Sequence, residues 1–224
     1  MTETRLDVRC LRVSRGSVRN LCYVALASDT REAVLIDPAW EFDAIERALQ
    51  DLGVTVVGIL ITHAHSDHIN LADACAERHG VPVYMAREEA AYYGYSSRFL
   101  DAFDSSSIRV GGLRVTAIPT PGHTHGSRCF LIGDALFSGD TLFTEGCGIC
   151  TSPGGSAGAM FESLRLLKQE VPANARVFPG HSFGRPPGRT FQELKRLNVY
   201  LGIDDKDQFV QFRMRPNQKA YRFQ

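Results

Sequence analysis

The sequence carries no excess of charge of either sign. Its 224 residues include 25 Lys and Arg and 25 Asp and Glu, so the formal net charge is zero. A neutral chain generates no long-range field that gathers nucleic acid or an anionic membrane surface. We therefore expect neither nucleic acid nor a membrane among the partners of this protein.

Long apolar runs and a disulfide framework are also missing. No stretch reaches the roughly 18 uninterrupted apolar residues that a membrane-spanning helix requires. No apolar segment follows the charged residues at the start of the sequence, as a secretory signal would require. The six cysteines are scattered through a chain too long to depend on disulfides. These features predict a cytoplasmic protein with reduced thiols.

Strand-like and helix-like segments alternate along the whole sequence. Apolar residues at the spacing of one helix face predict helices at residues 42–52, 69–78, 87–93, 157–168 and 190–201. Apolar and β-branched runs predict strands at residues 18–27, 33–36, 54–62, 81–85, 108–118 (a hairpin), 127–132, 135–138 and 176–178. The alternation predicts a layered α/β fold, and the lack of a linker or repeat predicts a single domain over residues 1–224.

The segment from Thr62 to His68 is dense in metal-ligand residue types and follows a buried strand. In extended backbone, His63 and His65 lie two residues apart and point to the same side. Asp67 and His68 come after the chain has turned toward the next helix, so they point elsewhere. Imidazole and carboxylate are ligands that zinc prefers. Two ligand sets at this spacing predict two metal ions, whereas a surface histidine cluster is the plainer alternative.

Three further candidate ligands each follow an apolar strand. His123 comes after Pro121-Gly122, Asp140 after Gly139, and His181 after Pro179-Gly180. Taken singly, each is better explained as an ordinary core or loop residue. Their occurrence in one chain with the histidine-rich segment favours a shared metal centre.

These motifs occur in the order His-x-His-x-Asp-His, Thr-Pro-Gly-His, Gly-Asp-Thr-Leu-Phe and Pro-Gly-His. This pattern resembles the metallo-β-lactamase superfamily, in particular its glyoxalase II-like branch. The resemblance implies a four-layer αββα sandwich with a short C-terminal extension and with the metals at one edge of the sheets. It implies one zinc on His63, His65 and His123 and a second on Asp67, His68 and His181. It further implies that Asp140 bridges the two ions and that Asp37 supports the metal loop from behind.

The two zinc ions that the resemblance implies would supply a bridging hydroxide near neutral pH; iron or mixed occupancy is the alternative. We expect this hydroxide to attack an acyl thioester, with Asp67 as the catalytic residue that orients it. The reaction then needs no serine or cysteine nucleophile. A thiolate leaving group also needs little protonation, which suits a site without an obvious general acid.

Residues 144–150 resemble the Gly-Cys-Gly segment of glyoxalase II enzymes, but Ile149 stands where those enzymes have a basic residue that helps to hold glutathione. The aromatic residue near the last histidine is displaced to Phe183. With residues 154–157 and 212–215, the pattern is most similar to the zinc-dependent hydrolases of trans-acyltransferase polyketide clusters. That similarity implies an acyl thioester on an acyl carrier protein or on a small thiol. The alternatives are a glutathione thioesterase, a mononuclear iron enzyme like persulfide dioxygenase, a hydrolase of lactones or β-lactams, and a non-catalytic assembly component.

Some remaining features have a plain and a functional interpretation. We expect Cys147 and Cys150 to pack in a loop rather than form a redox pair or half a zinc site. We expect His125 to face solvent. Residues from 205 onward carry a local net charge of +3 and are interpreted as a solvated tail, with a docking surface for an acidic carrier as the alternative. Residues 92–107 form either a lid or ordinary helix packing followed by a loop.

Overall fold

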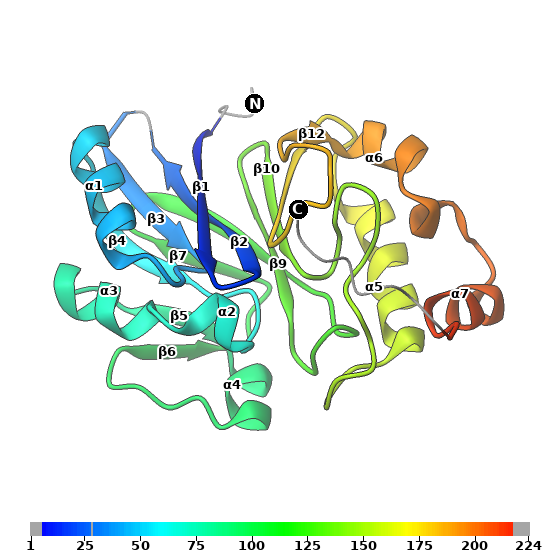
Figure 1. Cartoon of the computed structure of the whole chain (residues 1–224). Coiled ribbons are helices and arrows are strands. Elements are labelled where there is room, and N and C mark those ends of the chain that lie inside the picture. The colour runs from blue at the N-terminus through cyan, green and yellow to red at the C-terminus, as the bar shows by residue number, and fades with distance from the viewer. Residues whose placement is uncertain (1–5, 28, 217–224) are drawn as a thin grey trace.

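The computed structural model describes residues 6–27 and 29–216 and contains two six-stranded sheets (Figure 1). The first sheet has the order β1-β2-β3-β4-β5-β6. Its first three strands pair antiparallel and the strands from β3 to β6 pair parallel. The strands are β1 (Asp7–Arg15), β2 (Val18–Leu26), β3 (Glu32–Ile36), β4 (Thr55–Leu60), β5 (Val83–Ala86) and β6 (Leu100–Phe103).

The second sheet is built by the C-terminal half of the chain and has the order β12-β11-β10-β9-β8-β7. All of its pairs are antiparallel except β10 with β11, which is parallel. The strands are β7 (Ser107–Val110), β8 (Leu113–Pro119), β9 (Arg128–Ile132), β10 (Ala135–Gly139), β11 (Arg176–Pro179) and β12 (Arg189–Thr190).

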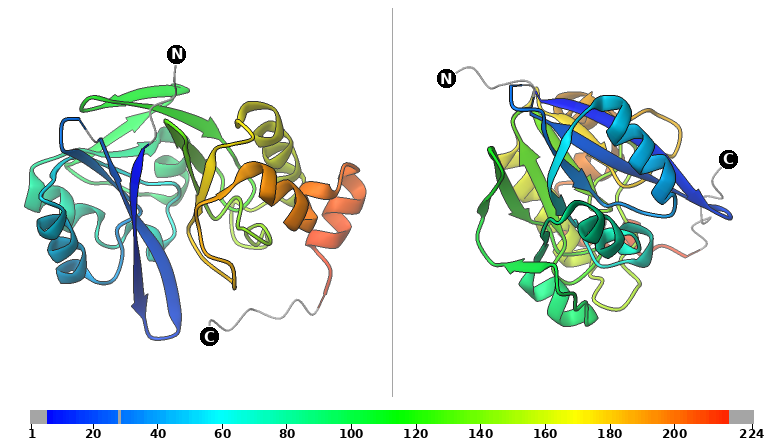
Figure 2. Two further views of the ribbon diagram at one scale, coloured as in Figure 1. Left: turned by 90° about the horizontal axis from the view of Figure 1, so that it is seen from above. Right: turned by 90° about the vertical axis from the view of Figure 1, so that its left-hand side faces the viewer.

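Helices cover the outer face of each sheet, as the view from above shows (Figure 2). The first sheet carries α1 (Phe42–Leu52), α2 (Ser66–Ile69), α3 (Ala72–His79) and α4 (Arg87–Tyr93). The second sheet carries α5 (Ala157–Glu170), α6 (Phe191–Leu197), the 3₁₀-helix η1 (Val199–Gly202) and α7 (Lys206–Arg213). The layers therefore follow the order αββα, which confirms the predicted sandwich.

The inner faces of the two sheets enclose an apolar core rich in aromatic side chains. The ring of Tyr23 on β2 lies 5.5 Å from those of Phe137 and Phe178 on the opposite sheet. Its hydroxyl donates a hydrogen bond to the carbonyl of Pro179 at 2.6 Å. Burial of aromatic area of this kind contributes strongly to stability, so the sheets are held at a fixed separation.

The loops that carry the candidate ligands follow the carboxyl ends of β4, β8, β10 and β11 and meet at one edge of both sheets. Backbone hydrogen bonds join the sheets at this edge. Leu21 N donates to the carbonyl of Gly180 at 2.8 Å, and Arg128 N donates to that of Thr62 at 2.9 Å. Because two sheets converge here, each contributes side chains to one site.

Most predicted elements are present, and α1 and α4 have the predicted bounds. The predicted helix 190–201 is interrupted at Asn198, whose side chain caps η1. The interpretation of the segment from 205 onward as a solvated tail is wrong for residues 206–213. They form α7, and Phe209 on its inner face is fully buried against Phe161 and Tyr200. Lys219 and Arg222, counted in that predicted tail, lie outside the described residues.

In the parts of the chain that the structure describes, no helix is long and apolar enough to cross a membrane.

Candidate metal centre

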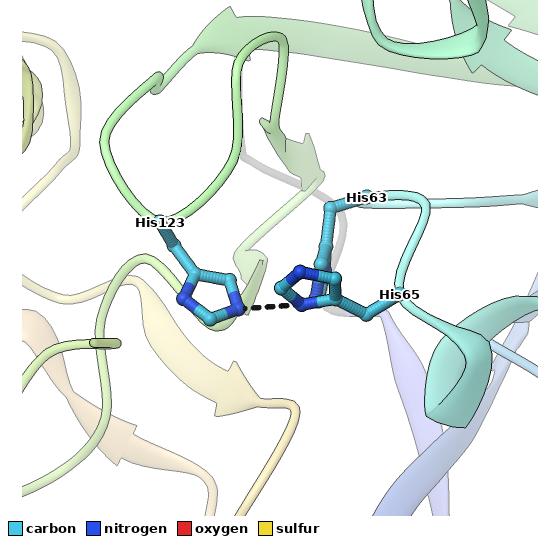
Figure 3. Close-up of side chains that lie close together, drawn as sticks. All are labelled: His63, His65 and His123. Atoms are coloured by element: carbon cyan, nitrogen blue, oxygen red, sulfur yellow. Dashed lines mark hydrogen bonds between the residues drawn. The ribbon is translucent and has the colours of Figure 1, made fainter. Parts of the chain in front are cut away.

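Three histidines from two loops converge in the first donor group (Figure 3). His63 and His65 follow β4, and His123 follows β8. One ring nitrogen of each lies within 4.8 Å of the others, and His123 Nε2 is 2.9 Å from His65 Nδ1. His63 and His123 are buried, whereas His65 is partly exposed. The structure therefore brings together the three residues that the family resemblance assigned to one metal.

The Nδ1 atoms of His63 and His123 each have a partner in the protein. His123 Nδ1 donates to the carbonyl of Ile149 at 2.7 Å, and His63 Nδ1 lies 3.0 Å from Thr62 Oγ1. A partner on one ring nitrogen fixes the orientation of the ring and leaves the other nitrogen for a metal. The Nε2 atoms of His63 and His123 are thus the candidate ligand atoms.

The second donor group consists of Asp67, His68 and His181. Asp67 and His68 lie on α2, and His181 follows β11. The Nε2 atoms of His181 and His68 are 3.4 Å and 3.8 Å from Asp67 Oδ2. His181 Nδ1 donates to the carbonyl of Arg19 at 2.7 Å, and His68 Nδ1 lies 2.9 Å from an oxygen of Asp37.

Asp140 lies between the two donor groups, at the end of β10. Its Oδ1 is 3.5 Å from His68 Nε2, and its Oδ2 is 3.5 Å from His123 Nε2 and 3.4 Å from His181 Nε2. The carboxylate therefore faces ligands of both groups. All seven residues that the sequence nominated lie in one cluster: His63, His65, Asp67, His68, His123, Asp140 and His181.

The first group holds neutral imidazoles. Burial and the neighbouring His68 lower the pKa of His63 well below its ordinary value. Burial and His123 lower the pKa of His65 to about 4, and burial lowers the pKa of His123. A neutral imidazole is the form that binds a metal, so this group is ready for one at neutral pH.

The second group contains a carboxylate, and the pKa of its histidine His181 shifts in the opposite direction. Burial alone would lower the pKa of His181, but the carboxylates of Asp140 and Asp67 outweigh it and raise the pKa to about 11. Burial would raise the pKa of both carboxyls, but the adjacent histidines, with Asn20 at Asp67, hold them well below the usual range. Without a metal, this group is an ion-paired cluster with the proton on histidine.

Several features of the chain fit a metal at this place. The buried atoms His63 Nε2 and Asp140 Oδ1 have no hydrogen-bond partner among the described residues. A Cβ on Gly180 would lie 2.5 Å from both Asp140 Oδ1 and His68 Cε1. A Cβ on Gly148 would lie 2.8 Å from His123 Nδ1. Five imidazoles and two carboxylates suit zinc, so the residues present fit the expected ions.

Asp37 has the supporting position that the resemblance implied. Its Oδ1 accepts from Thr62 N at 2.8 Å, and its Oδ2 accepts from Thr62 Oγ1 at 2.6 Å and faces His68 Nδ1. Asp37 has φ +52°, in the left-handed region that Asp and Asn tolerate better than most residues. The residue joins the end of β4 to α2 and thereby links the two donor groups.

Sequence reasoning missed Asn20 on β2, which is buried beside the second group. Its Nδ2 donates to Asp67 Oδ2 at 3.1 Å, and its Oδ1 accepts from Trp40 Nε1 at 2.9 Å. Because an indole nitrogen can only donate, this contact fixes which end of the amide faces Asp67. The signal in the sequence was a polar residue that, next to Arg19, opens an otherwise apolar strand.

Outside the cluster, the plain interpretations of Cys147, Cys150 and His125 fit the structure. Cys147 and Cys150 are buried free thiols in the apolar cluster around α5. His125 is exposed, and its ring stacks on Tyr92 at 4.5 Å. Of the candidate lid at 92–107, residues 100–103 form the edge strand β6, so that part belongs to the sheet.

Comparison with known proteins identifies similar chains. The chain is 42% identical over 202 residues to the probable polyketide biosynthesis zinc-dependent hydrolase PksB of Bacillus subtilis, covering 90% of each protein. It is 34% identical to the hydroxyacylglutathione hydrolase of Shewanella halifaxensis, over 73% of this chain and 62% of that enzyme. The sequence is thus related both to a hydrolase named for polyketide biosynthesis and to hydroxyacylglutathione hydrolases, the glyoxalase II-like branch.

A solved structure and a family description agree with these relatives. The crystal structure of ETHE1 from Myxococcus xanthus superposes with a TM-score of 0.80 at 29% identity, covering 97% of this chain and 94% of that one. Residues 17–181, which include the whole donor cluster, match the family described as the Metallo-beta-lactamase superfamily. With the αββα fold and the order of its ligand loops, the chain belongs to the metallo-β-lactamase superfamily.

Proposed function

We propose that this protein is a binuclear zinc hydrolase that cleaves an acyl thioester in polyketide biosynthesis. The observation that carries the proposal is the position of Asp140, whose two oxygens face ligands of both donor groups. A carboxylate so placed is suited to bridging two ions. The relationship to enzymes named as zinc-dependent hydrolases supports a metal-dependent hydrolase.

When bound, the two zinc ions supply Lewis acidity and a hydroxide nucleophile near neutral pH. The residues of the chain position that chemistry. His63, His65 and His123 would hold one ion, and Asp67, His68 and His181 the other. Asp67 is ionised because the adjacent histidines and Asn20 lower its pKa, and it is partly exposed. It is therefore able to accept a hydrogen bond from the nucleophile and to orient it.

The buried thiols nearby do not offer an alternative nucleophile. Burial raises the pKa of Cys150 to about 11 and raises that of Cys147 further. The reactive form of cysteine is the thiolate, so both side chains are unreactive at neutral pH. This supports a hydroxide-based attack without a covalent acyl-enzyme.

Two observations support a thiol carrier other than glutathione. PksB, which is named as a probable polyketide biosynthesis hydrolase, is matched over 90% of both chains, whereas only 62% of the hydroxyacylglutathione hydrolase is covered. Ile149, 51% exposed, stands where the resemblance leads us to expect a basic residue, and its carbonyl contacts His123. An exposed apolar side chain beside the ligands favours an acyl group on a carrier protein or a small neutral thiol.

The proposal is tested by elemental analysis of the purified protein together with a thioester panel. The panel contains acyl conjugates of glutathione, coenzyme A, an acyl carrier protein and a small neutral thiol, each assayed with the metal-replete protein. We expect two zinc ions per chain and fastest hydrolysis of the carrier-protein or small acyl thioester. No thioester turnover by a protein that holds its full metal would refute the proposed activity.

The same assay separates the alternatives. Preference for the glutathione conjugate would assign a glyoxalase II-type enzyme. One iron per chain, with oxygen uptake on glutathione persulfide, would assign a persulfide dioxygenase-like oxidoreductase. Turnover of lactones or β-lactams alone would change the substrate class, and failure to bind metal would favour a non-catalytic assembly component.

A further inference from the structure

We propose that Glu89 is a positioning residue that holds the two loops of the first donor group at the distance required for zinc binding. The inference rests on the proposed function, because it assumes that His63, His65 and His123 bind an ion. Glu89 lies on α4 and is fully buried. None of the ligand motifs contains it.

The carboxylate of Glu89 joins the loops through their backbones. Its Oε1 accepts from Ala64 N at 2.8 Å, and its Oε2 accepts from Gly126 N at 2.6 Å. Ala64 stands between His63 and His65, and Gly126 follows His123 by three residues. One side chain thus connects the loop after β4 in the first sheet to the loop after β8 in the second.

The second loop is pressed against α4 at this point. A Cβ on Gly126 would lie 2.5 Å from Glu88 Cγ and 2.6 Å from Glu89 N. The position therefore requires glycine, because any side chain would move the loop away from the helix and lengthen the bond from Gly126 N to Glu89. The same movement would carry His123 away from His63 and His65.

The chemistry of the contact requires a carboxylate. Each of its two oxygens accepts one N–H, and burial of an ionised group is tolerated only with such partners. A glutamine at this position could accept at one oxygen, but its amide NH₂ would face the second backbone N–H, donor against donor. An aspartate keeps both acceptors on a side chain that is one methylene shorter.

Support of its own helix does not account for these contacts. Glu89 is in the first turn of α4, which has no side-chain hydrogen bond at its N-cap. Both backbone hydrogen bonds that its carboxylate accepts come from the ligand loops. The neighbouring Glu88 instead pairs with Arg128 at 2.8 Å and is much more exposed, so it provides a matched control on the same turn.

The test measures zinc affinity by chelator competition in two backgrounds. His181→Ala disables the second donor group, and His123→Ala disables the first. Glu89→Gln and the control Glu88→Gln are introduced into each background. We expect Glu89→Gln to weaken zinc binding by roughly 10- to 100-fold, the usual effect of removing a residue that supports the ligands, in the His181→Ala background only. Glu88→Gln should have no comparable effect in either.

Equal weakening in both backgrounds, or none in either, would overturn the inference. Circular dichroism and thermal unfolding of the metal-free variants show whether each chain folds. If Glu89→Gln does not fold, Glu89→Asp decides by the same comparison, with selective weakening in the His181→Ala background as the supporting result. A His181→Ala protein that binds no zinc would instead contradict the proposed function, so the two failures are distinguishable.

Discussion

His68 Nδ1 lies 2.9 Å from Asp37 Oδ2, and both side chains are buried. The carboxylate can only accept, so it requires the imidazole proton on Nδ1. That proton leaves Nε2, which is 3.5 Å from Asp140 and 3.8 Å from Asp67, as the candidate ligand atom. Asp37 thereby sets the tautomer of a candidate ligand, and its own two oxygens are occupied by Thr62 and His68.

Asp37→Asn should weaken zinc binding at the second donor group by roughly 10- to 100-fold. Asparagine keeps the acceptor for Thr62 N and tolerates the positive φ of this position. Its NH₂ would replace Oδ2 and donate to His68 Nδ1, which moves the imidazole proton to Nε2. Chelator titration of the metal-loaded variant should show one ion retained and one released early.

The Asp37→Asn prediction has a folding control and a contradicting outcome. Circular dichroism should show the wild-type fold, because the backbone conformation is conserved by the substitution. Retention of both ions with unchanged affinity would show that the Asp37 contact does not set the tautomer of His68.

Zinc binding at the second donor group should release at least one more proton than zinc binding at the first donor group. His181 carries a proton at pH 7 in the metal-free protein, because its pKa is raised to about 11 by Asp140 and Asp67. The pKa values of His63, His65 and His123 are lowered, so these residues have no proton to lose. Calorimetric zinc titrations at pH 7, in two buffers of different ionisation enthalpy, measure the difference.

The pKa of His181 in the folded and unfolded states also predicts how the stability of the metal-free protein changes with pH. The folded-state pKa of His181 is about 11, above the unfolded value of roughly 6.5. Its contribution to the free energy of unfolding of the metal-free protein is therefore complete below about pH 6.5 and is lost as the pH rises toward 11.

The calorimetric titration also has a contradicting outcome. Equal proton release for the two ions would show that His181 is neutral before zinc binds.

The seven candidate ligands could be found from sequence because each follows the end of an apolar strand. The residues that hold them were missed for a physical reason. Asn20 lies within a strand and Glu89 on a helix, and each reaches the site only after the elements pack together. No local spacing encodes such contacts.

The strand β1 and the helix α7 were also not predicted from the sequence, for a similar physical reason. β1 was not predicted because it is an edge strand with a single buried residue, Val13, so its apolar alternation is weak. α7 was not predicted because Phe209 is its only fully buried side chain and polar residues dominate the rest of the segment. Long-range packing rather than local pattern determines both.

Gly180→Ala should reduce zinc content and lower the hydrolytic rate by on the order of 100-fold, the effect expected from a displacement of about 1 Å at a reacting centre. The new Cβ would lie 2.5 Å from Asp140 Oδ1 and from His68 Cε1. Either side chain would have to leave its present position. Elemental analysis and thioester hydrolysis check this result.

Gly202→Ala is the matched control, because a Cβ there meets no atom within 4 Å. It should retain wild-type zinc content and rate. Full zinc and full activity in Gly180→Ala would mean that the space beside Asp140 is not used by a metal or by the reaction.

Asp140→Ala should abolish hydrolysis and lower the zinc content to one ion per chain or less, since its carboxylate faces ligands of both groups. Cys150→Ser should keep both zinc content and rate, because the new hydroxyl is able to replace the contact of Sγ with the carbonyl of Gly148. Its free energy of unfolding should fall by about 1 kcal/mol. Elemental analysis, thioester hydrolysis and thermal unfolding of the two variants side by side separate a ligand from a packing residue. Zinc loss in Cys150→Ser would instead give that cysteine a part in metal binding, and full zinc retention in Asp140→Ala would remove the bridge on which the binuclear proposal depends.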